Sequence, residues 1–171
     1  SYAEKTTNNT NFALLVSEKF TEPFKEPIQY GQHIARLANM LGGGILVQRF
    51  GDLLDGRRST PERIKSSIIK PTLTCATPGD LSLVIPYRQM TSIIEMLQAL
   101  DKICPGTASR YTLLYGIEVK FYSARVKLTN ELETEGVKNL FAIGDGAGVT
   151  RGLIQASASG VHVARTICAR G

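Results

Sequence analysis

The residue types best suited to chemistry lie close together, where an apolar run meets a glycine-rich turn. Residues 140–143 read Leu-Phe-Ala-Ile, and residues 144–148 read Gly-Asp-Gly-Ala-Gly. The apolar run predicts a strand that is buried on both faces of a parallel sheet, and the glycines let a ligand approach the backbone without meeting a Cβ atom. The carboxylate of Asp145 is a good acceptor for ligand hydroxyl groups, so the turn is a candidate binding site.

A helix is expected directly after this turn, from residue 151 or 152 to residue 169. Its free N–H groups and the positive end of its dipole favour an electron-rich partner. Ligands of open α/β sheets bind at the carboxyl ends of the strands, where this turn would lie. A second interpretation stays open, because an aspartate beside a glycine-rich turn commonly does no more than cap the helix. The dinucleotide fingerprint G-x-G-x-x-G with a downstream acid is absent.

The sequence around this turn resembles a known flavoprotein motif. Residues 134–145, Thr-Glu-Gly-Val-Lys-Asn-Leu-Phe-Ala-Ile-Gly-Asp, are similar to the second flavin-binding motif of two-dinucleotide-binding flavoproteins, in which a threonine precedes an apolar strand that ends in Gly-Asp. Together with residues 77–81 and 114–123, residues 144–160 resemble a family of uncharacterised bacterial and archaeal FAD-dependent dehydrogenases. The resemblance runs from residue 8 to residue 165. Flavoproteins that modify tRNA are more distant relatives of that family.

The resemblance implies FAD as the cofactor and hydride or electron transfer as the reaction. It implies that Asp145 binds the ribityl chain, and that the helix start from Val149 to Leu153 stabilises reduced flavin, whose pyrimidine end carries negative charge. A small-molecule redox substrate is expected, with NAD(P)H as a common electron donor in such enzymes, and no catalytic residue is predicted. The residues expected to contact the cofactor are Gly144, Asp145, Gly146, Ala147, Gly148, Thr150, Arg151, Gly152 and Leu153.

Members of that family carry an N-terminal G-x-G-x-x-G for the ADP half of FAD within a longer chain, and this sequence has none. We therefore expect the chain to be the carboxy-terminal part of a parent protein, inactive alone, with the remainder of the parent as its main partner. The expected fold class is α+β with an α/β portion. Residues 1–129 would form an inserted α+β substrate domain. Residues 130–171 would form the last strand–turn–helix unit of a Rossmann-like FAD-binding domain.

Periodicity and turn residues predict the other elements. Strands are expected at 12–17, 45–50, 112–115 and 116–122. Helices are expected at 28–41, at 61–69 behind Ser59 or Thr60 as the N-cap, and at 91–103. The segment 51–60 is expected to be a loop.

The composition bounds the protein class. The chain has 171 residues and a formal net charge of +5, from twenty Lys and Arg against fifteen Asp and Glu. No apolar run reaches the roughly 18 residues that cross a bilayer. Three cysteines lack C-x-x-C spacing, and there are only two histidines, so a reducing cytoplasm and no structural metal are expected. The scattered basic residues favour a solvated surface over a nucleic-acid site. A nucleic-acid-associated module and a non-catalytic interaction domain remain the alternative function classes.

Several other side chains are weaker candidates. The pair Arg57-Arg58 suits a solvated loop better than a site for an anionic substrate or nucleic acid. Cys75 has no visible feature that would lower its pKa, and both His33 and His162 fit structural or surface roles. Residues of the inserted region that would line a substrate pocket are Tyr87, Arg88, Tyr115 and Lys120. Gln155 would cap the last helix or face solvent.

Overall fold

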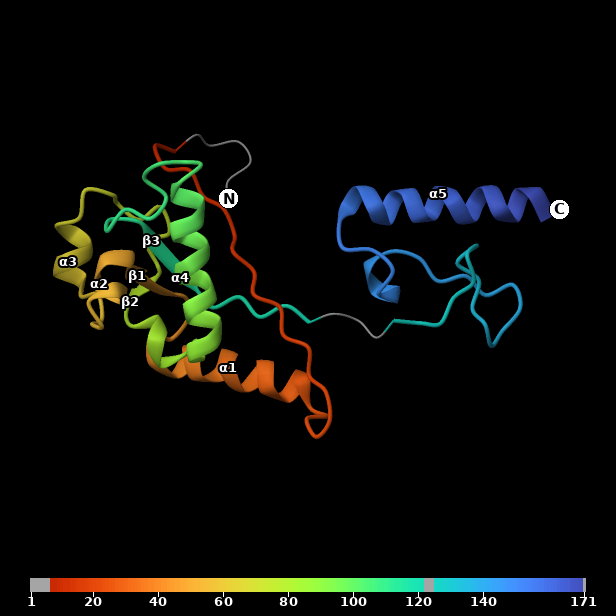
Figure 1. Ribbon diagram of the computed structural model, residues 1–171, viewed down its shortest axis with the longest axis horizontal. Coiled ribbons are helices and arrows are strands. Elements are labelled where there is room, and N and C mark those ends of the chain that lie inside the picture. The colour runs from red at the N-terminus through yellow and green to blue at the C-terminus, as the bar shows by residue number, and fades with distance from the viewer. Residues whose placement is uncertain (1–6, 122–124, 171) are drawn as a thin grey trace. The chain divides into compact units, whose positions relative to one another are not determined.

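The computed structural model describes residues 7–121 and 125–170, and the chain divides into two compact units (Figure 1). Unit 1 ends at Val119, and unit 2 begins at Lys120. The sequence predicted the change of organisation near residue 129, where the composition shifts. The contacts thus assign the segment 120–129 to unit 2 rather than to the larger unit.

Unit 1 contains a small mixed sheet. Its strands are β1 (Leu46–Arg49), β2 (Thr77–Pro78) and β3 (Leu113–Gly116), in the order β2-β1-β3. Strand β1 pairs parallel with β2 and antiparallel with β3. The coarse expectation of an α+β fold is therefore confirmed.

The described residues of unit 1 also form four helices and one 3-10 turn. They are α1 (Pro27–Gly42), α2 (Phe50–Leu54), α3 (Pro61–Lys65), η1 (Leu81–Leu83) and α4 (Tyr87–Asp101). Helix α1 ends at Gly43, whose φ of 65° is left-handed and favours glycine. Helix α3 begins behind Thr60, whose side chain accepts a hydrogen bond from the backbone N–H of Arg63.

The core of unit 1 joins these helices to β1. The buried side chains come from all the longer elements: Ala38, Leu46, Phe50, Leu53, Leu81, Val84, Met90 and Leu97. Each large side chain of this set is removed almost completely from water, and burial of that kind is worth about 1.5–3 kcal/mol per residue. The packing therefore fixes the position of β1 and of the polar residues that follow it.

Two strands predicted for unit 1 do not form. The segment 12–17 pairs with no strand, and its Phe12 and Leu15 side chains are 55% and 61% exposed. The physical reason is that both edges of β1 are already paired, with β2 and β3. The predicted strand 116–122 also fails, because the four residues of β1 pair with 113–116 and provide no partner beyond Gly116. Its residue 122 lies outside the described residues.

Three helix boundaries differ from the prediction. The segment 51–60 is not all loop, because α2 occupies 50–54 and buries Phe50 and Leu53. Helix α3 ends at Lys65 instead of residue 69. Helix α4 begins at Tyr87, directly after Pro86, instead of at residue 91. Pro86 suits the position before a helix because it lacks the N–H that a helix interior would need.

Unit 2 contains the glycine-rich turn and the last helix. The turn forms a 3-10 helix, η2 (Asp145–Ala147), and α5 spans Leu153–Arg170. The predicted buried strand 140–143 is wrong for this unit: only a bridge between Glu133 and Phe141 forms, and Leu140 and Ile143 are 51% and 45% exposed. A strand buried on both faces needs paired neighbours and covering layers, which the described residues of unit 2 do not supply.

Candidate functional site

The glycine-rich turn of unit 2 depends on backbone conformations that only glycine adopts readily. Gly144 has φ 73° and ψ −167°, and Gly148 has φ 68°. The N–H of Gly144 donates to Oγ of Ser159 at 3.1 Å, and that hydroxyl donates to the carbonyl oxygen of Ala156 at 2.7 Å. Ser159 is buried on α5. It therefore fastens the turn to the helix.

Asp145 organises the rest of the turn. Its Oδ1 accepts a hydrogen bond from Oγ1 of Thr150 at 2.6 Å and another from the N–H of Gly152 at 3.2 Å. Its carbonyl oxygen accepts from the N–H of Gly148 at 3.0 Å. Within the described residues, both hydrogen bonds of this carboxylate go to Oδ1. Asp145 thus closes the loop that leads into α5, as the capping interpretation expects, and Oδ2 keeps its lone pairs for another donor.

Five of the predicted cofactor residues are joined by contacts of the turn, and the other four differ in their exposure to solvent. Gly144, Asp145, Gly148, Thr150 and Gly152 are joined by the contacts of the turn, whereas the side chain of Ala147 is buried. Gly146 and Arg151 are exposed. Leu153, at the first position of α5, is 89% exposed. The Oε1 atom of Gln155 lies 2.5 Å from where a Cβ at Gly152 would stand, so a side chain at residue 152 would displace the exposed end of Gln155.

A cavity of about 650 Å³ adjoins this turn within unit 2. Val149 contributes one wall, and residues before the turn contribute the others: Arg125, Val126, Lys127, Leu128, Thr129, Asn130, Leu132 and Glu135. The volume is within the range that small-molecule sites occupy, about 300–1,000 Å³. No binding role was predicted for the residues before the turn, because a polar segment of that kind is also typical of a loop that connects two elements.

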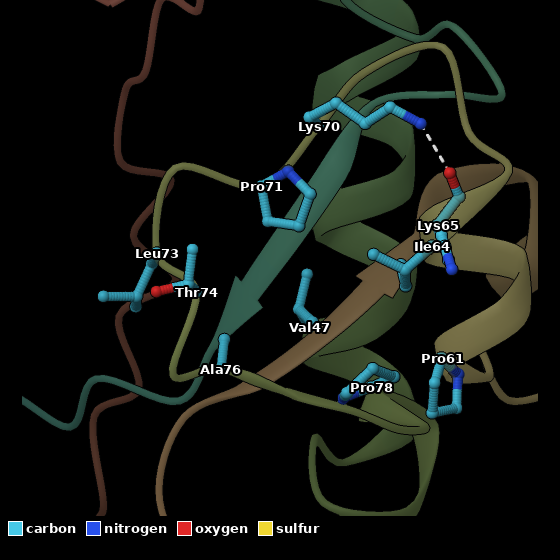
Figure 2. Close-up of a pocket in the computed structure, with 10 residues that line it drawn as sticks. All are labelled: Val47, Pro61, Ile64, Lys65, Lys70, Pro71, Leu73, Thr74, Ala76 and Pro78. Carbon is cyan, nitrogen blue, oxygen red and sulfur yellow. Dashed lines mark hydrogen bonds between the residues drawn. The ribbon is translucent and has the colours of Figure 1, made fainter.

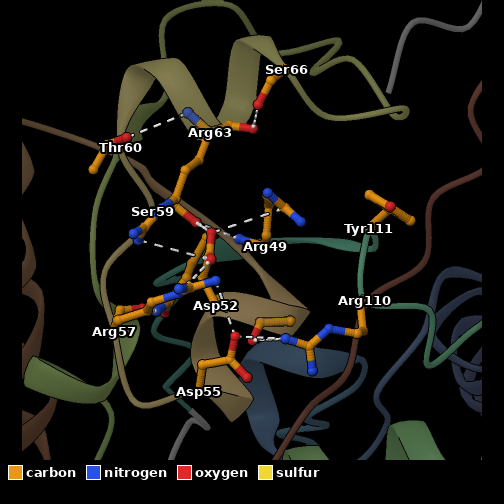
Figure 3. Close-up of polar contacts among 12 residues, drawn as sticks. Arg49, Asp52, Asp55, Arg57, Ser59, Thr60, Arg63, Ser66, Arg110 and Tyr111 are labelled. Carbon is orange, nitrogen blue, oxygen red and sulfur yellow. Dashed lines mark hydrogen bonds and ion pairs between the residues drawn. The ribbon is translucent and has the colours of Figure 1, made fainter.

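Unit 1 holds a polar cluster that the sequence did not predict (Figure 3). At its centre is Asp52, fully buried on α2. Its Oδ1 accepts from Nε of Arg57 at 3.0 Å, and its Oδ2 accepts from Oγ of Ser59 at 2.8 Å. Nε of Arg49 and Nη1 of Arg63 each lie 3.9 Å from one of its oxygens. Buried carboxylates persist only when paired and hydrogen-bonded in this way.

The exposed rim of this cluster is a second ion pair. Asp55 contacts Nη2 of Arg110 at 2.6 Å and Nη2 of Arg57 at 3.1 Å. The hydrogen bond from Arg110 holds the pKa of Asp55 below its ordinary value, and the same bond raises the pKa of Arg110. Arg57 and Arg58 are exposed and lie outside helices and strands, as predicted, and Arg57 in addition bridges two carboxylates. The pair of opposite charges at Asp52 and Arg57, five residues apart, is the feature of the sequence that could have indicated this cluster.

An apolar pocket lies beside β2 (Figure 2). It has a volume of about 540 Å³ and is lined mainly by apolar side chains with two lysines at one end: Val47, Pro61, Ile64, Lys65, Lys70, Pro71, Leu73, Thr74, Ala76 and Pro78. None of the predicted substrate-pocket residues lines it. Tyr87 is 87% exposed on α4, and Arg88 beside it is exposed as well. Partial burial raises the pKa of Tyr115, which lies near the backbone of Thr72 and Leu73.

The soft metal ligands are dispersed. Cys75, Cys104 and Cys168 are free and exposed, and the exposed His162 contacts the carbonyl oxygen of Asn130 through Nε2 at 3.2 Å. Among the described residues, no group of three or more His, Cys, Asp or Glu side chains is arranged to hold a metal ion. Within the same residues, no helix has both the length and the apolar character that crossing a membrane requires.

Comparison with known proteins gives one relative and no family. No protein-family model matches the chain. The chain is 32% identical over 178 residues to an uncharacterized protein of Clostridium beijerinckii, and the match covers 98% of this chain. The chain spans about a third of that relative, since the match covers 32% of its length. The matched segment of that relative therefore corresponds to both units of this chain.

Proposed function

We infer that the chain is part of an FAD-dependent oxidoreductase, in which residues 144–153 form one wall of the flavin site. The observation that carries this proposal is the closed loop around Asp145, which presents a carboxylate oxygen beside the start of α5. That arrangement combines an acceptor for ligand hydroxyl groups with donors for a ligand that carries negative charge. The resemblance of residues 134–145 to a flavin-binding motif supports the choice of FAD over other nucleotides.

The start of α5 fits the electron-rich end of a flavin. Gly152 donates its N–H to Asp145, but the N–H groups of Leu153, Ile154 and Gln155 have no acceptor in the part of the chain that the structure describes. The first N–H groups of a helix carry partial positive charge. They would stabilise the negative charge that reduced flavin bears near N1 and O2, and FAD, when bound, would supply the hydride or electron transfer itself.

The apolar side chains around this helix start also fit a larger parent. Leu153 and Ile154 are 89% and 83% exposed, and Leu140 and Ile143 are about half exposed. Contiguous exposed apolar side chains mark surfaces that another element covers. We propose that unit 2 is the strand–turn–helix end of a Rossmann-like FAD-binding domain and that unit 1 is an inserted α+β domain. The substrate and the electron donor belong to the longer protein.

The test uses the longer protein that contains this chain. We expect it to purify with the visible absorption of a flavin and to release FAD on denaturation. Asp145→Asn keeps an oxygen for Thr150 and Gly152 but replaces Oδ2 with an amide that cannot accept a hydrogen bond. Because a hydrogen bond to a charged group is worth about 1.5–3 kcal/mol, FAD affinity should fall about tenfold to a hundredfold, while the melting temperature of the apoprotein stays unchanged.

The matched control is Glu95→Gln, an exposed carboxylate on α4, which should leave FAD affinity unchanged. A colourless longer protein that takes up no added FAD would refute the proposal. Residues 144–153 would then be a helix-capping turn, and unit 2 would be a candidate interaction module. An Asp145→Asn variant with normal FAD affinity would remove Asp145 from the flavin site but leave the cofactor assignment standing.

A further inference from the structure

The corner of unit 1 around Asp52 carries more positive charge than its own carboxylates neutralise. Residues 49–63 contain four arginines, and Arg110 joins them through Asp55. The carboxylates of this corner are Asp52, Asp55 and Glu62. Five guanidinium groups therefore face three carboxylates, which leaves a surplus of two positive charges. Such a surplus on a folded corner attracts anions.

The contacts show that Arg49 is the arginine of this corner with a buried guanidinium nitrogen that has no hydrogen bond, whereas Arg58 is exposed to solvent. Arg57 uses Nε and Nη2 on two carboxylates, and Arg110 uses Nη2 on Asp55. Arg63 donates through Nη1 to the carbonyl oxygen of Arg58 at 3.0 Å. The guanidinium of Arg49, by contrast, makes no hydrogen bond to any described residue. Its nearest carboxylate oxygen lies 3.9 Å from Nε, beyond hydrogen-bond distance, and Nε is buried.

The buried Nε–H of Arg49 has no hydrogen-bond acceptor among the described residues, which is costly unless a further acceptor approaches it. The Arg49 side chain is only 16% exposed, and a buried charged donor without an acceptor loses its hydration without compensation. Its place is nevertheless fixed. The guanidinium carbon lies 5.3 Å from the ring centroid of Tyr111, and the backbone N–H of Arg49 donates to Ser59 at 2.8 Å.

We propose that Arg49 is the centre of a binding site for the oxyanion group of a small molecule, a phosphate or a carboxylate. The guanidinium carbon of Arg49 lies over the ring of Tyr111, and the fork of N–H groups suits a planar or tetrahedral oxyanion. Figure 3 shows Arg49 on the Tyr111 side of Asp52, while Arg57 lies on the other side and shares the opposite oxygen of Asp52. Arg57 neutralises Asp52, so the buried carboxylate does not repel the ligand.

This site is in unit 1 and needs nothing from the glycine-rich turn of unit 2. A test of this site therefore neither supports nor refutes the flavin proposal. The chemistry of the site, one fixed guanidinium with surplus positive charge around it, selects for the charged group and not for the rest of the ligand. Two probes, inorganic phosphate and acetate, therefore distinguish a phosphate ligand from a carboxylate ligand.

The experiment titrates the 171-residue chain with inorganic phosphate or with acetate, at constant ionic strength maintained with chloride, and follows the melting temperature and the heat of binding. One of the two probes should raise the melting temperature of the wild type above the chloride control, and that probe identifies the oxyanion class. Arg49→Gln should weaken the binding at least about tenfold. Arg49→Lys keeps the charge but not the fork, and should bind with intermediate affinity. Arg36→Gln removes an exposed arginine of α1 and should bind like the wild type.

A second readout on the unmodified sequence covers the case in which Arg49→Gln does not fold. The Arg49 Nε–H resonance should shift on addition of the binding probe, while the Arg36 Nε–H resonance should not. The proposal is refuted if neither probe exceeds the chloride control. Equal weakening by Arg49→Gln and Arg36→Gln also refutes it, because the binding would then be a diffuse effect of surface charge.

Discussion

Replacement of Asp52 tests most directly how unit 1 is held together. Asp52 is fully buried and accepts two hydrogen bonds, from Arg57 at 3.0 Å and from Ser59 at 2.8 Å. Ser59 is fully buried too, and its hydroxyl oxygen also accepts the backbone N–H of Arg49, the last residue of β1. The carboxylate thus joins α2, the end of β1 and the segment before α3.

The expected loss differs between two substitutions. Asp52→Ala removes both acceptors, so the Ser59 hydroxyl loses its acceptor and Arg57 keeps only its ion pair with Asp55. Breaking a buried ion pair by removing one partner costs about 3–5 kcal/mol. Arg57 is about half exposed and can regain water, so we expect the lower end, about 3 kcal/mol. Asp52→Asn keeps an oxygen for Arg57 and lets the amide donate to Ser59, so we expect a loss of about 1–2 kcal/mol.

Urea unfolding followed by tyrosine fluorescence measures these losses. Tyr30, Tyr87, Tyr111 and Tyr115 all belong to unit 1, so the signal reports mainly on that unit. Glu95→Gln is the matched control and should change the free energy of unfolding by less than about 0.5 kcal/mol. A loss below about 1 kcal/mol for Asp52→Ala would refute the reasoning. It would mean that the cluster relaxes around the missing carboxylate and that Asp52 does not hold the corner in place.

Three further predictions concern the backbone of both units and the acid stability of unit 2. Gly144→Ala places a side chain at φ 73° and ψ −167°, a region almost exclusive to glycine. It should cost about 1–3 kcal/mol, and an unchanged thermal unfolding curve would contradict the strain. Gly51→Ala puts a Cβ 2.9 Å from the carbonyl oxygen of Arg110, so α2 must shift and the melting temperature should fall. A variant as stable as the wild type would show that the backbones separate freely. A hydrogen bond from Arg170 lowers the pKa of Glu133, so their ion pair stabilises unit 2 above the ordinary pKa of 4.5 and is lost as the pH falls through the lowered value. Circular dichroism melts at neutral and strongly acidic pH should show a smaller acid effect in Arg170→Gln, and an equal effect would refute the link.

The sequence determined the elements whose signals are local. Helix α1 follows from its apolar spacing together with a start at Pro27 and a stop at Gly43, and α3 follows from Thr60 and Pro61. The turn at Gly144 and Gly148 was readable for the same reason, because a positive φ needs glycine whatever surrounds it. These features depend on backbone sterics and capping bonds within a few residues.

Tertiary structure decided which apolar runs became strands. The runs 12–17 and 140–143 have the composition of strands, but a strand exists only when another segment accepts its hydrogen bonds. In unit 1 the partners of β1 are 77–78 and 113–116, a choice made by the packing of the core and not by the strand residues. The composition of each run alone could not reveal which segments would pair.

The candidate sites show the same division. The sequence indicated Asp145 as a candidate because it stands in a glycine-rich turn, and its partners Thr150 and Gly152 lie within seven residues of it. The cluster at Asp52 was missed because Arg110 and Tyr111 are distant in sequence and reach Asp55 and Arg49 only in the folded unit. Neighbouring residues determine the local backbone conformation, whereas charge pairing and burial depend on which segments the core brings together.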